Sequence, residues 1–196
     1  ATVTLPPGLE TDRALDALNA RLPDDIRIIE FAVAPPGFDA RDDATSKTYR
    51  YVIWNAPECP EARVGRVWHI PGLLDVAAMR AACPAFLGQL DFASFATKPN
   101  FKQATTVRHL QHIELCAEAP LIEITMRADG FLYKMVRNIV RAIVKVGEGR
   151  TSLAQLNRII AAQDRNAAPG TAPASGLYLE AVAYDETPIN TAVPLP

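Results

Sequence analysis

The stretch LIEITMRA (Leu121–Ala128), followed by FLYKMVRNIVRAIVKV (Phe131–Val146), carries the clearest secondary-structure signal in this chain of 196 residues. The first part alternates apolar and polar residues, which is the pattern of a strand with one buried face. The second part repeats its apolar residues at i, i+3, i+4, i+7 and i+8, which is typical of a helix with a broad apolar stripe. The sequence therefore predicts a strand at 121–128 and a helix over about 131–146 that stops at Gly147.

Similar patterns continue on both sides of this stretch. Helices are predicted at about 12–22, 74–88 and 152–163, and strands at 26–34, 47–54, 107–117 and 176–184. Ala119-Pro120 separates two of the strands and predicts a hairpin turn. Strands joined by short turns and interleaved with helices predict an α+β fold, with a mainly antiparallel sheet flanked by helices.

Composition and charge narrow the function classes. The three cysteines and three histidines have no metal-ligand spacing, so no metal is expected, and free thiols suit a reducing cytoplasm. No apolar run approaches the roughly 18 residues of a membrane span. The net charge is −2, yet residues 98–150 carry a net charge of +4. Such a segment can bind a polyanion locally, or it can simply form a solvated helix face.

Two patterns point to RNA, although each has a plainer interpretation. In the predicted strand at 47–54, Lys47, Tyr49 and Tyr51 share one face, and Thr48 and Arg50 share the other. An aromatic face beside cations suits an unstacked base and its phosphates, but a half-buried strand gives the same pattern. The loop 98–108 is basic through Lys98, Lys102 and Arg108, but it could equally be a solvated turn.

The predicted long helix has a polar side opposite its apolar stripe, formed by Lys134, Asn138, Arg141 and Lys145. Arg137 lies at the edge of the stripe, about 120° from its centre at 100° per residue. An arginine at such an edge either extends to solvent or is half-buried against a carboxylate or phosphate. The residues alone leave both interpretations open.

Taken in order, six strings resemble the tRNA pseudouridine synthase A family. They are ALNARLPDDI (17–26), FDAR (38–41), KTYRY (47–51), DFASF (91–95), GFLYKMVRNI (130–139) and TAPASGLYL (171–179). The resemblance implies a pseudouridine synthase fold and a cytoplasmic enzyme that isomerises uridine to pseudouridine at positions 38–40 of the tRNA anticodon arm. It implies no cofactor, no metal and no membrane, with tRNA bound across a homodimer.

The resemblance also assigns roles to individual residues. Tyr49 matches the tyrosine that lies against the target base, and Arg137 matches the arginine that pairs with the catalytic carboxylate. Phe38 and Arg41 match a tRNA-contacting stretch. The loop around 100–104 matches another such stretch, so Lys98, Lys102 and Arg108 are expected to bind tRNA as well.

One part of the family pattern does not occur in these 196 residues. The family's nucleophile is the aspartate of a Gly-Arg-Thr-Asp string, which is not found here. The resemblance therefore implies a fold that is incomplete at the N-terminus and a chain that is inactive by itself. Residues 1–45 would be the remainder of an N-terminal half, 46–186 the C-terminal half of the catalytic domain, and 187–196 a loose Pro-rich tail. The alternative is a non-catalytic tRNA-binding module derived from the family.

Overall fold

A computed structural model of the chain describes residues 1–97 and 105–184. The chain divides into two compact units, Ala1–Ala44 and Thr45–Pro196. In residues 1–97 and 105–184, no helix is both long enough and apolar enough to cross a membrane.

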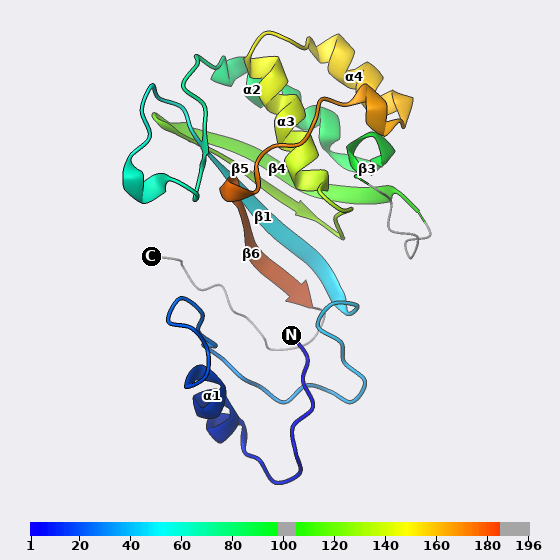
Figure 1. The fold of residues 1–196 in the computed structure, drawn as a ribbon. Helices are drawn as coiled ribbons and strands as arrows, with labels where there is room; N and C mark the ends of the chain where they lie inside the picture. Colours follow the sequence, from blue (N-terminus) through cyan, green and yellow to red (C-terminus); the bar gives the residue numbers. More distant parts are fainter. Residues whose placement is uncertain (98–104, 185–196) are drawn as a thin grey trace. The chain divides into compact units, whose positions relative to one another are not determined.

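The second unit contains one sheet, in which the described residues form six strands (Figure 1). The strands are β1 (Ala44–Trp54), β2 (Trp68–His69), β3 (Gly88–Asp91), β4 (Val107–Glu118), β5 (Leu121–Ala128) and β6 (Leu177–Tyr184). Their order is β2-β1-β5-β4-β3, and β6 pairs with β1. The β1–β5, β5–β4 and β4–β3 pairs are antiparallel, whereas β1–β2 is parallel. The predicted α+β fold with a mainly antiparallel sheet is therefore confirmed.

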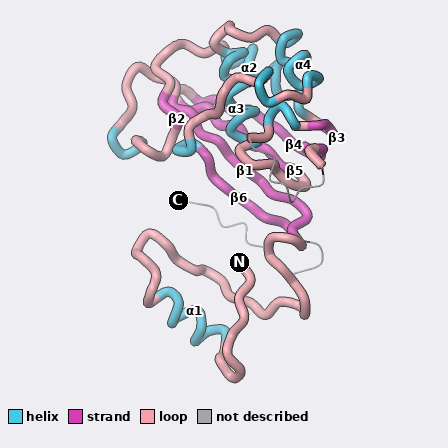
Figure 2. The backbone as a smooth tube through the Cα atoms, turned by 45° about the vertical axis from the view of Figure 1, so that its right-hand side comes forward, coloured by secondary structure: helices cyan, strands magenta, loops and turns pink. Residues whose placement is uncertain are grey.

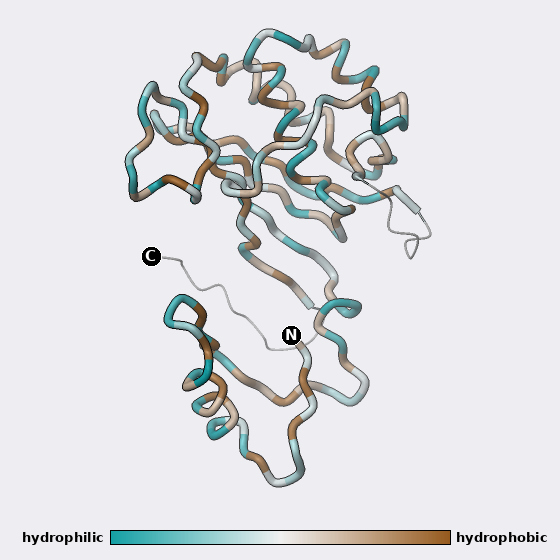
Figure 3. The backbone as a smooth tube through the Cα atoms, viewed as in Figure 1, coloured by the Kyte–Doolittle hydropathy of each residue, from teal (hydrophilic) through white to brown (hydrophobic). Residues whose placement is uncertain are grey.

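Three helices, α2 (Val76–Ala82), α3 (Met135–Gly147) and α4 (Leu153–Ala162), lie on one face of this sheet (Figures 1 and 2). Hydrophobic and hydrophilic positions alternate along β4, β5 and α3, so each element has one apolar side (Figure 3). The apolar sides meet in a core whose largest fully buried side chains include Tyr51, Ile124, Met126, Ile139 and Ile143. Burial of this apolar surface is the main term that holds the helices on the sheet.

The long helix begins at Met135 and not near 131 as predicted. Lys134 adopts a left-handed conformation with φ of 61°, which a continuous α-helix excludes. The turn before it is held by a hydrogen bond from the Thr97 amide to the Tyr133 carbonyl, at 3.0 Å. Tyr133 and Lys134 therefore form a turn at the start of α3, and Phe131 lies in the loop just before it.

The predicted polar side of this helix is partly wrong, because Asn138 is fully buried. Its side-chain amide donates to the Phe95 carbonyl at 2.6 Å and to Thr97 Oγ1 at 3.1 Å. Arg141 is partly covered, with its guanidinium 5.3 Å from the centre of the Trp68 ring. Loops from distant parts of the chain thus cover a helix side that the sequence pattern assigns to solvent.

The first unit contains α1 (Thr11–Asn19), which is shorter than the predicted helix over 12–22. The predicted strand at 26–34 is wrong, since those residues form no strand in the structure. The Ile28 amide and carbonyl instead bond the side chain of Asn19, at 2.8 and 2.9 Å. The predicted helix over 74–88 is α2 extended by a 3₁₀ turn, Cys83–Phe86, and then β3 begins.

Candidate functional site

Tyr49 lies on β1 opposite the buried Met126 of β5, on the sheet face that the helices cover. Its ring meets the edge of Phe131, with 5.1 Å between ring centroids and 86° between planes. The side chain is half-buried, and burial raises the pKa of its hydroxyl. Tyr49 is therefore neutral at pH 7, and in the described part of the chain its hydroxyl has no hydrogen-bond partner.

Arg137 lies in the first turn of α3 and is joined to Ala172 twice. Its Nε donates to the Ala172 carbonyl at 2.6 Å, and the Ala172 amide donates to the Arg137 carbonyl at 3.2 Å. Among residues 1–97 and 105–184, no acceptor bonds its two terminal nitrogens. The Nε side of the guanidinium is thus fixed. The two terminal nitrogens remain available to bind both oxygens of one carboxylate.

Residues Thr171–Pro173, which we call the 171–173 segment, form hydrogen bonds with both α3 and β1. The Thr171 hydroxyl donates to Asn138 Oδ1 at 2.7 Å. The Tyr51 hydroxyl donates to the Pro173 carbonyl at 2.7 Å. Burial raises the pKa of Tyr51, and the nearby charges of Arg137 and Arg141 partly oppose that rise. The 171–173 segment therefore brings Arg137 near Tyr51, which lies two residues along the same face of β1 from Tyr49.

Arg108 lies on β4, beside the turn that precedes α3. Its Nη1 donates to the carbonyls of Thr105 and Val107, at 3.1 and 2.5 Å. Its Nε would be 3.5 Å from a β-carbon placed on Gly130, so the side chain packs flat on that glycine. Lys98 and Lys102 lie outside the described residues.

Phe38 and Arg41 belong to the first unit. Asp39 Oδ1 accepts hydrogen bonds from the amides of Arg41 and Asp42 at 2.8 and 3.0 Å, and these bonds lower the pKa of Asp39. The Asp39 amide donates in turn to Asp43 Oδ2 at 2.7 Å. Both carboxylates therefore stabilise a turn, on which Arg41 is exposed and Phe38 is partly buried.

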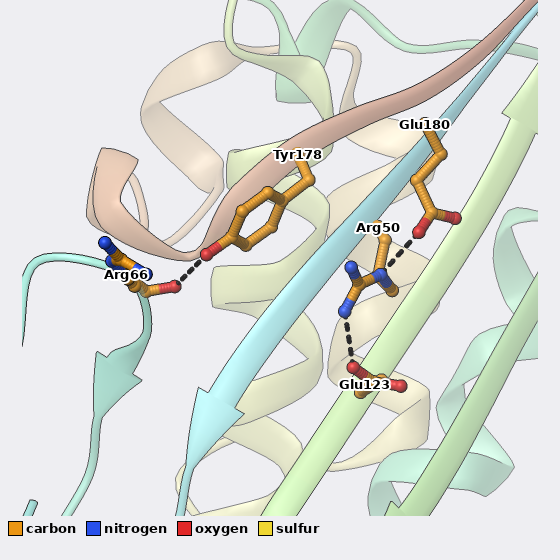
Figure 4. A network of polar contacts seen from close by, with 5 residues as sticks. All are labelled: Arg50, Arg66, Glu123, Tyr178 and Glu180. Carbon is orange, nitrogen blue, oxygen red and sulfur yellow. Dashed lines mark hydrogen bonds and ion pairs between the residues drawn. The ribbon is translucent and has the colours of Figure 1, made fainter. Parts of the chain in front are cut away.

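A separate polar network lies on the other face of β1 (Figure 4). Arg50 donates from Nη1 to Glu123 of β5 at 2.6 Å and from Nε to Glu180 of β6 at 2.5 Å. Its guanidinium also lies 5.1 Å from the centre of the Tyr178 ring, and the Tyr178 hydroxyl donates to the Arg66 carbonyl at 2.6 Å. This network joins β1, β5 and β6 and contacts none of the predicted site residues.

Sequence reasoning gave no role to Tyr51, Asn138 or Thr171. For Tyr51 there was a signal, since it lies on the same strand face as Tyr49. For the other two the only signal was their place in the strings at 130–139 and 171–179, because Asn138 and Thr171 are 33 residues apart and only the fold joins them.

A mainly antiparallel sheet with helices on one face, and an arginine held by the Ala172 backbone in the first turn of α3, define an α+β protein with a polar site at the start of α3. The sequence model of the tRNA pseudouridine synthase family matches residues 82–185. The tRNA pseudouridine synthase A of Methylacidiphilum infernorum (isolate V4) is 42% identical over 184 residues, which cover 94% of this chain and 72% of that protein. A relative from Clostridium perfringens, tRNA pseudouridine synthase A 2, is 41% identical over 168 residues, covering 86% of this chain and 68% of its own length.

A third relative, the tRNA pseudouridine synthase A of Citrifermentans bemidjiense, is 38% identical over 185 residues, covering 90% of this chain and 73% of that protein. The chain belongs to the tRNA pseudouridine synthase family. The resemblance found in the six sequence strings is thereby confirmed.

Proposed function

We propose that this chain is part of an enzyme that isomerises uridine to pseudouridine at positions 38–40 of the tRNA anticodon arm. The observation that carries the proposal is the state of Arg137: its Nε is anchored on the Ala172 carbonyl, and its terminal nitrogens bond no acceptor in residues 1–97 and 105–184. The names of the relatives support tRNA as the substrate.

The isomerisation consumes no second substrate. The bond between N1 of uracil and C1′ of the ribose breaks, the ring turns, and C5 bonds to C1′. The hydrogen on C5 leaves as a proton and N1 gains one, so product and substrate are isomers. The target base must leave the stacked arm for a nucleophile to reach it.

Arg137 would pair with the nucleophilic aspartate of a Gly-Arg-Thr-Asp string, which the 196 residues do not contain. A guanidinium beside a half-buried carboxylate keeps that carboxylate ionised and therefore nucleophilic. The fork of two terminal nitrogens also fixes its direction, because both carboxylate oxygens can be bound at once. The bond from Nε to Ala172 sets the direction of the fork before any partner arrives.

Tyr49 would lie against the flipped uracil. Its ring is held at the edge by Phe131, so a base can stack on a surface that is already ordered. Its neutral hydroxyl has no partner within the described residues, so it can bond the base or assist a proton transfer.

The tRNA backbone would contact Arg41, Lys98, Lys102 and Arg108, with Phe38 beside Arg41. Arg108 lies against Gly130, which directly precedes Phe131. Cations at such positions bind phosphates without reading sequence. We further propose a cytoplasmic homodimer with the tRNA across both subunits, in line with the family resemblance.

The proposal is tested by mapping pseudouridine in tRNA treated with this chain joined to an N-terminal segment that carries Gly-Arg-Thr-Asp. Carbodiimide labelling followed by primer extension should stop at positions 38–40 and nowhere else in the tRNA. Stops at other positions would contradict the proposed substrate site. If the gene itself encodes no such segment upstream of Ala1 in frame, the chain is instead a tRNA-binding module without catalysis.

A further inference from the structure

The three residues of the 171–173 segment are each tied to a different side chain. Thr171 bonds Asn138 of α3 at 2.7 Å, Ala172 accepts from Arg137 at 2.6 Å, and Pro173 accepts from Tyr51 of β1 at 2.7 Å. Only the middle contact involves the arginine of the proposed site. The outer two contacts hold the ends of the segment, so they set where the Ala172 carbonyl lies.

The contact on the α3 side has a fixed orientation. Asn138 is fully buried, and its amide nitrogen is taken by the Phe95 carbonyl at 2.6 Å and by Thr97 Oγ1 at 3.1 Å. The amide oxygen must therefore point toward Thr171, since turning the group would place like atoms together. Arg165 strengthens this side, with Nη2 3.4 Å from Thr171 Oγ1.

The contact on the β1 side is equally constrained. Tyr51 is fully buried, and its ring lies so close to Gly176 that a β-carbon there would stand 2.8 Å from it. The hydroxyl donates to the Pro173 carbonyl at 2.7 Å. The segment is thus bonded from the helix by the buried Asn138 and from the sheet by the buried Tyr51.

We infer that Thr171, Asn138 and Tyr51 are positioning residues for Arg137, and this inference rests on the proposed function of that arginine. They fix the position of the Ala172 carbonyl, and the bond that Nε donates to that carbonyl orients the guanidinium toward the carboxylate of the nucleophilic aspartate. A displacement of about 1 Å at a reacting group can lower the rate on the order of 10²-fold. The three contacts therefore affect the rate through the orientation of the guanidinium. The three side chains act through Arg137 and have no contact with the uridine.

The aim of Arg137 can be measured in the 196-residue chain without any catalysis. In ¹⁵N-labelled protein, the Arg137 Nε–H resonance is identified by its loss in Arg137→Lys. Its hydrogen exchange should be slow because the Ala172 carbonyl holds it. Thr171→Val keeps the shape of the side chain and removes the hydroxyl, and Tyr51→Phe does the same for the phenol. Each should speed the exchange by about tenfold, the effect of losing one net hydrogen bond.

Two further variants serve as controls. Thr171→Ser keeps the hydroxyl and should bring the exchange rate back toward that of the wild type. Tyr178→Phe removes another short bond from a phenol to a carbonyl, 2.6 Å to Arg66, but on the other face of β1 (Figure 4). It should leave the Arg137 exchange unchanged. If folded Thr171→Val exchanges like the wild type, the inference is wrong, even where Tyr51→Phe fails to fold.

Kinetics in the chain joined to a segment that carries Gly-Arg-Thr-Asp separate positioning from binding. Thr171→Val should lower kcat by about tenfold and leave KM for tRNA unchanged, because only the aim of Arg137 is lost. A rise in KM with kcat unchanged would overturn the inference. If the wild-type protein makes no pseudouridine, the proposed function fails, while the exchange experiment still decides whether these residues position Arg137.

Discussion

Gly176 lies against Tyr51 so closely that a β-carbon on the glycine would stand 2.8 Å from the tyrosine ring and 2.6 Å from the Val52 carbonyl oxygen. Real β-carbons do not approach backbone oxygens at that distance, so only glycine fits. This contact seats the start of β6 on β1 and holds the ring whose hydroxyl binds Pro173.

The first prediction follows from this contact. Gly176→Ala should lower the free energy of unfolding by about 1–3 kcal/mol, because the fully buried Tyr51 ring and the Val52 backbone cannot retreat. Gly170→Ala is the matched control in the same loop, since a β-carbon there meets nothing within 4 Å. Urea titration of both variants checks the difference, and an equal effect in the two would show that the close contact is not rigid.

Arg50 carries the second prediction. Arg50→Met should lower the free energy of unfolding by about 1–2 kcal/mol, because Glu123 and Glu180 lose their shared cation while partly buried. Arg150→Met is the control, since its ion pair with Glu148 is long at 3.4 Å and its side chain is 71% exposed. Thermal unfolding should separate the two variants. A stability loss no larger than that of the control would mean that the network on β1 contributes little.

Sequence patterns predicted the main strand and helix of the core because each pattern depends on residues that are close together in the sequence. The alternation in 121–128 and the apolar stripe of α3 depend on residues near one another in the chain, so both were found. The strand predicted at 26–34 was wrong because the Asn19 side chain bonds the Ile28 backbone, which no apolar pattern reveals.

The roles of Arg137 and Tyr49 come from the family resemblance and stay predictions. The patterns only drew attention to Arg137 at the edge of the apolar stripe and to Tyr49 beside cations on a strand. The burial of Asn138 depends on Phe95, Thr97 and Thr171, which are distant in sequence, so the pattern assigned it to solvent. Contacts between loops that are distant in the sequence leave no periodic pattern in it, so only the structure reveals them.

Tyr49 carries the third prediction. In the chain joined to a segment that carries Gly-Arg-Thr-Asp, Tyr49→Phe should bind tRNA as the unsubstituted protein does and turn over more slowly, because only the hydroxyl is lost. Tyr49→Ala should in addition weaken tRNA binding by about 1–3 kcal/mol, the usual worth of one base–aromatic stack. Filter binding and single-turnover rates measure the two effects. Full turnover by Tyr49→Phe would exclude a catalytic part for the hydroxyl.

The fourth prediction concerns the basic residues Arg41, Lys98, Lys102 and Arg108. Each phosphate contact that is removed should flatten the dependence of log affinity on log salt by roughly 0.7–0.9. Neutralising all four should weaken every tRNA alike, because phosphates carry no sequence information. An unchanged salt slope in the quadruple variant would place the tRNA surface elsewhere on the protein.

Arg137 carries the last prediction, and with it the central claim that this chain supplies the cation of a pseudouridine synthase site. The direct measurement is tritium release from tRNA whose uridines are labelled at C5, since forming the new bond expels that hydrogen. The 196-residue chain should release none, because the Gly-Arg-Thr-Asp string does not occur in it. Joined to a segment with that string, it should release tritium. Arg137→Ala should then remove most of the activity, and Arg137→Lys should restore only part, because an ammonium lacks the two-pronged geometry. Robust release by the 196-residue chain alone, or full activity of Arg137→Ala in the longer protein, would contradict this account.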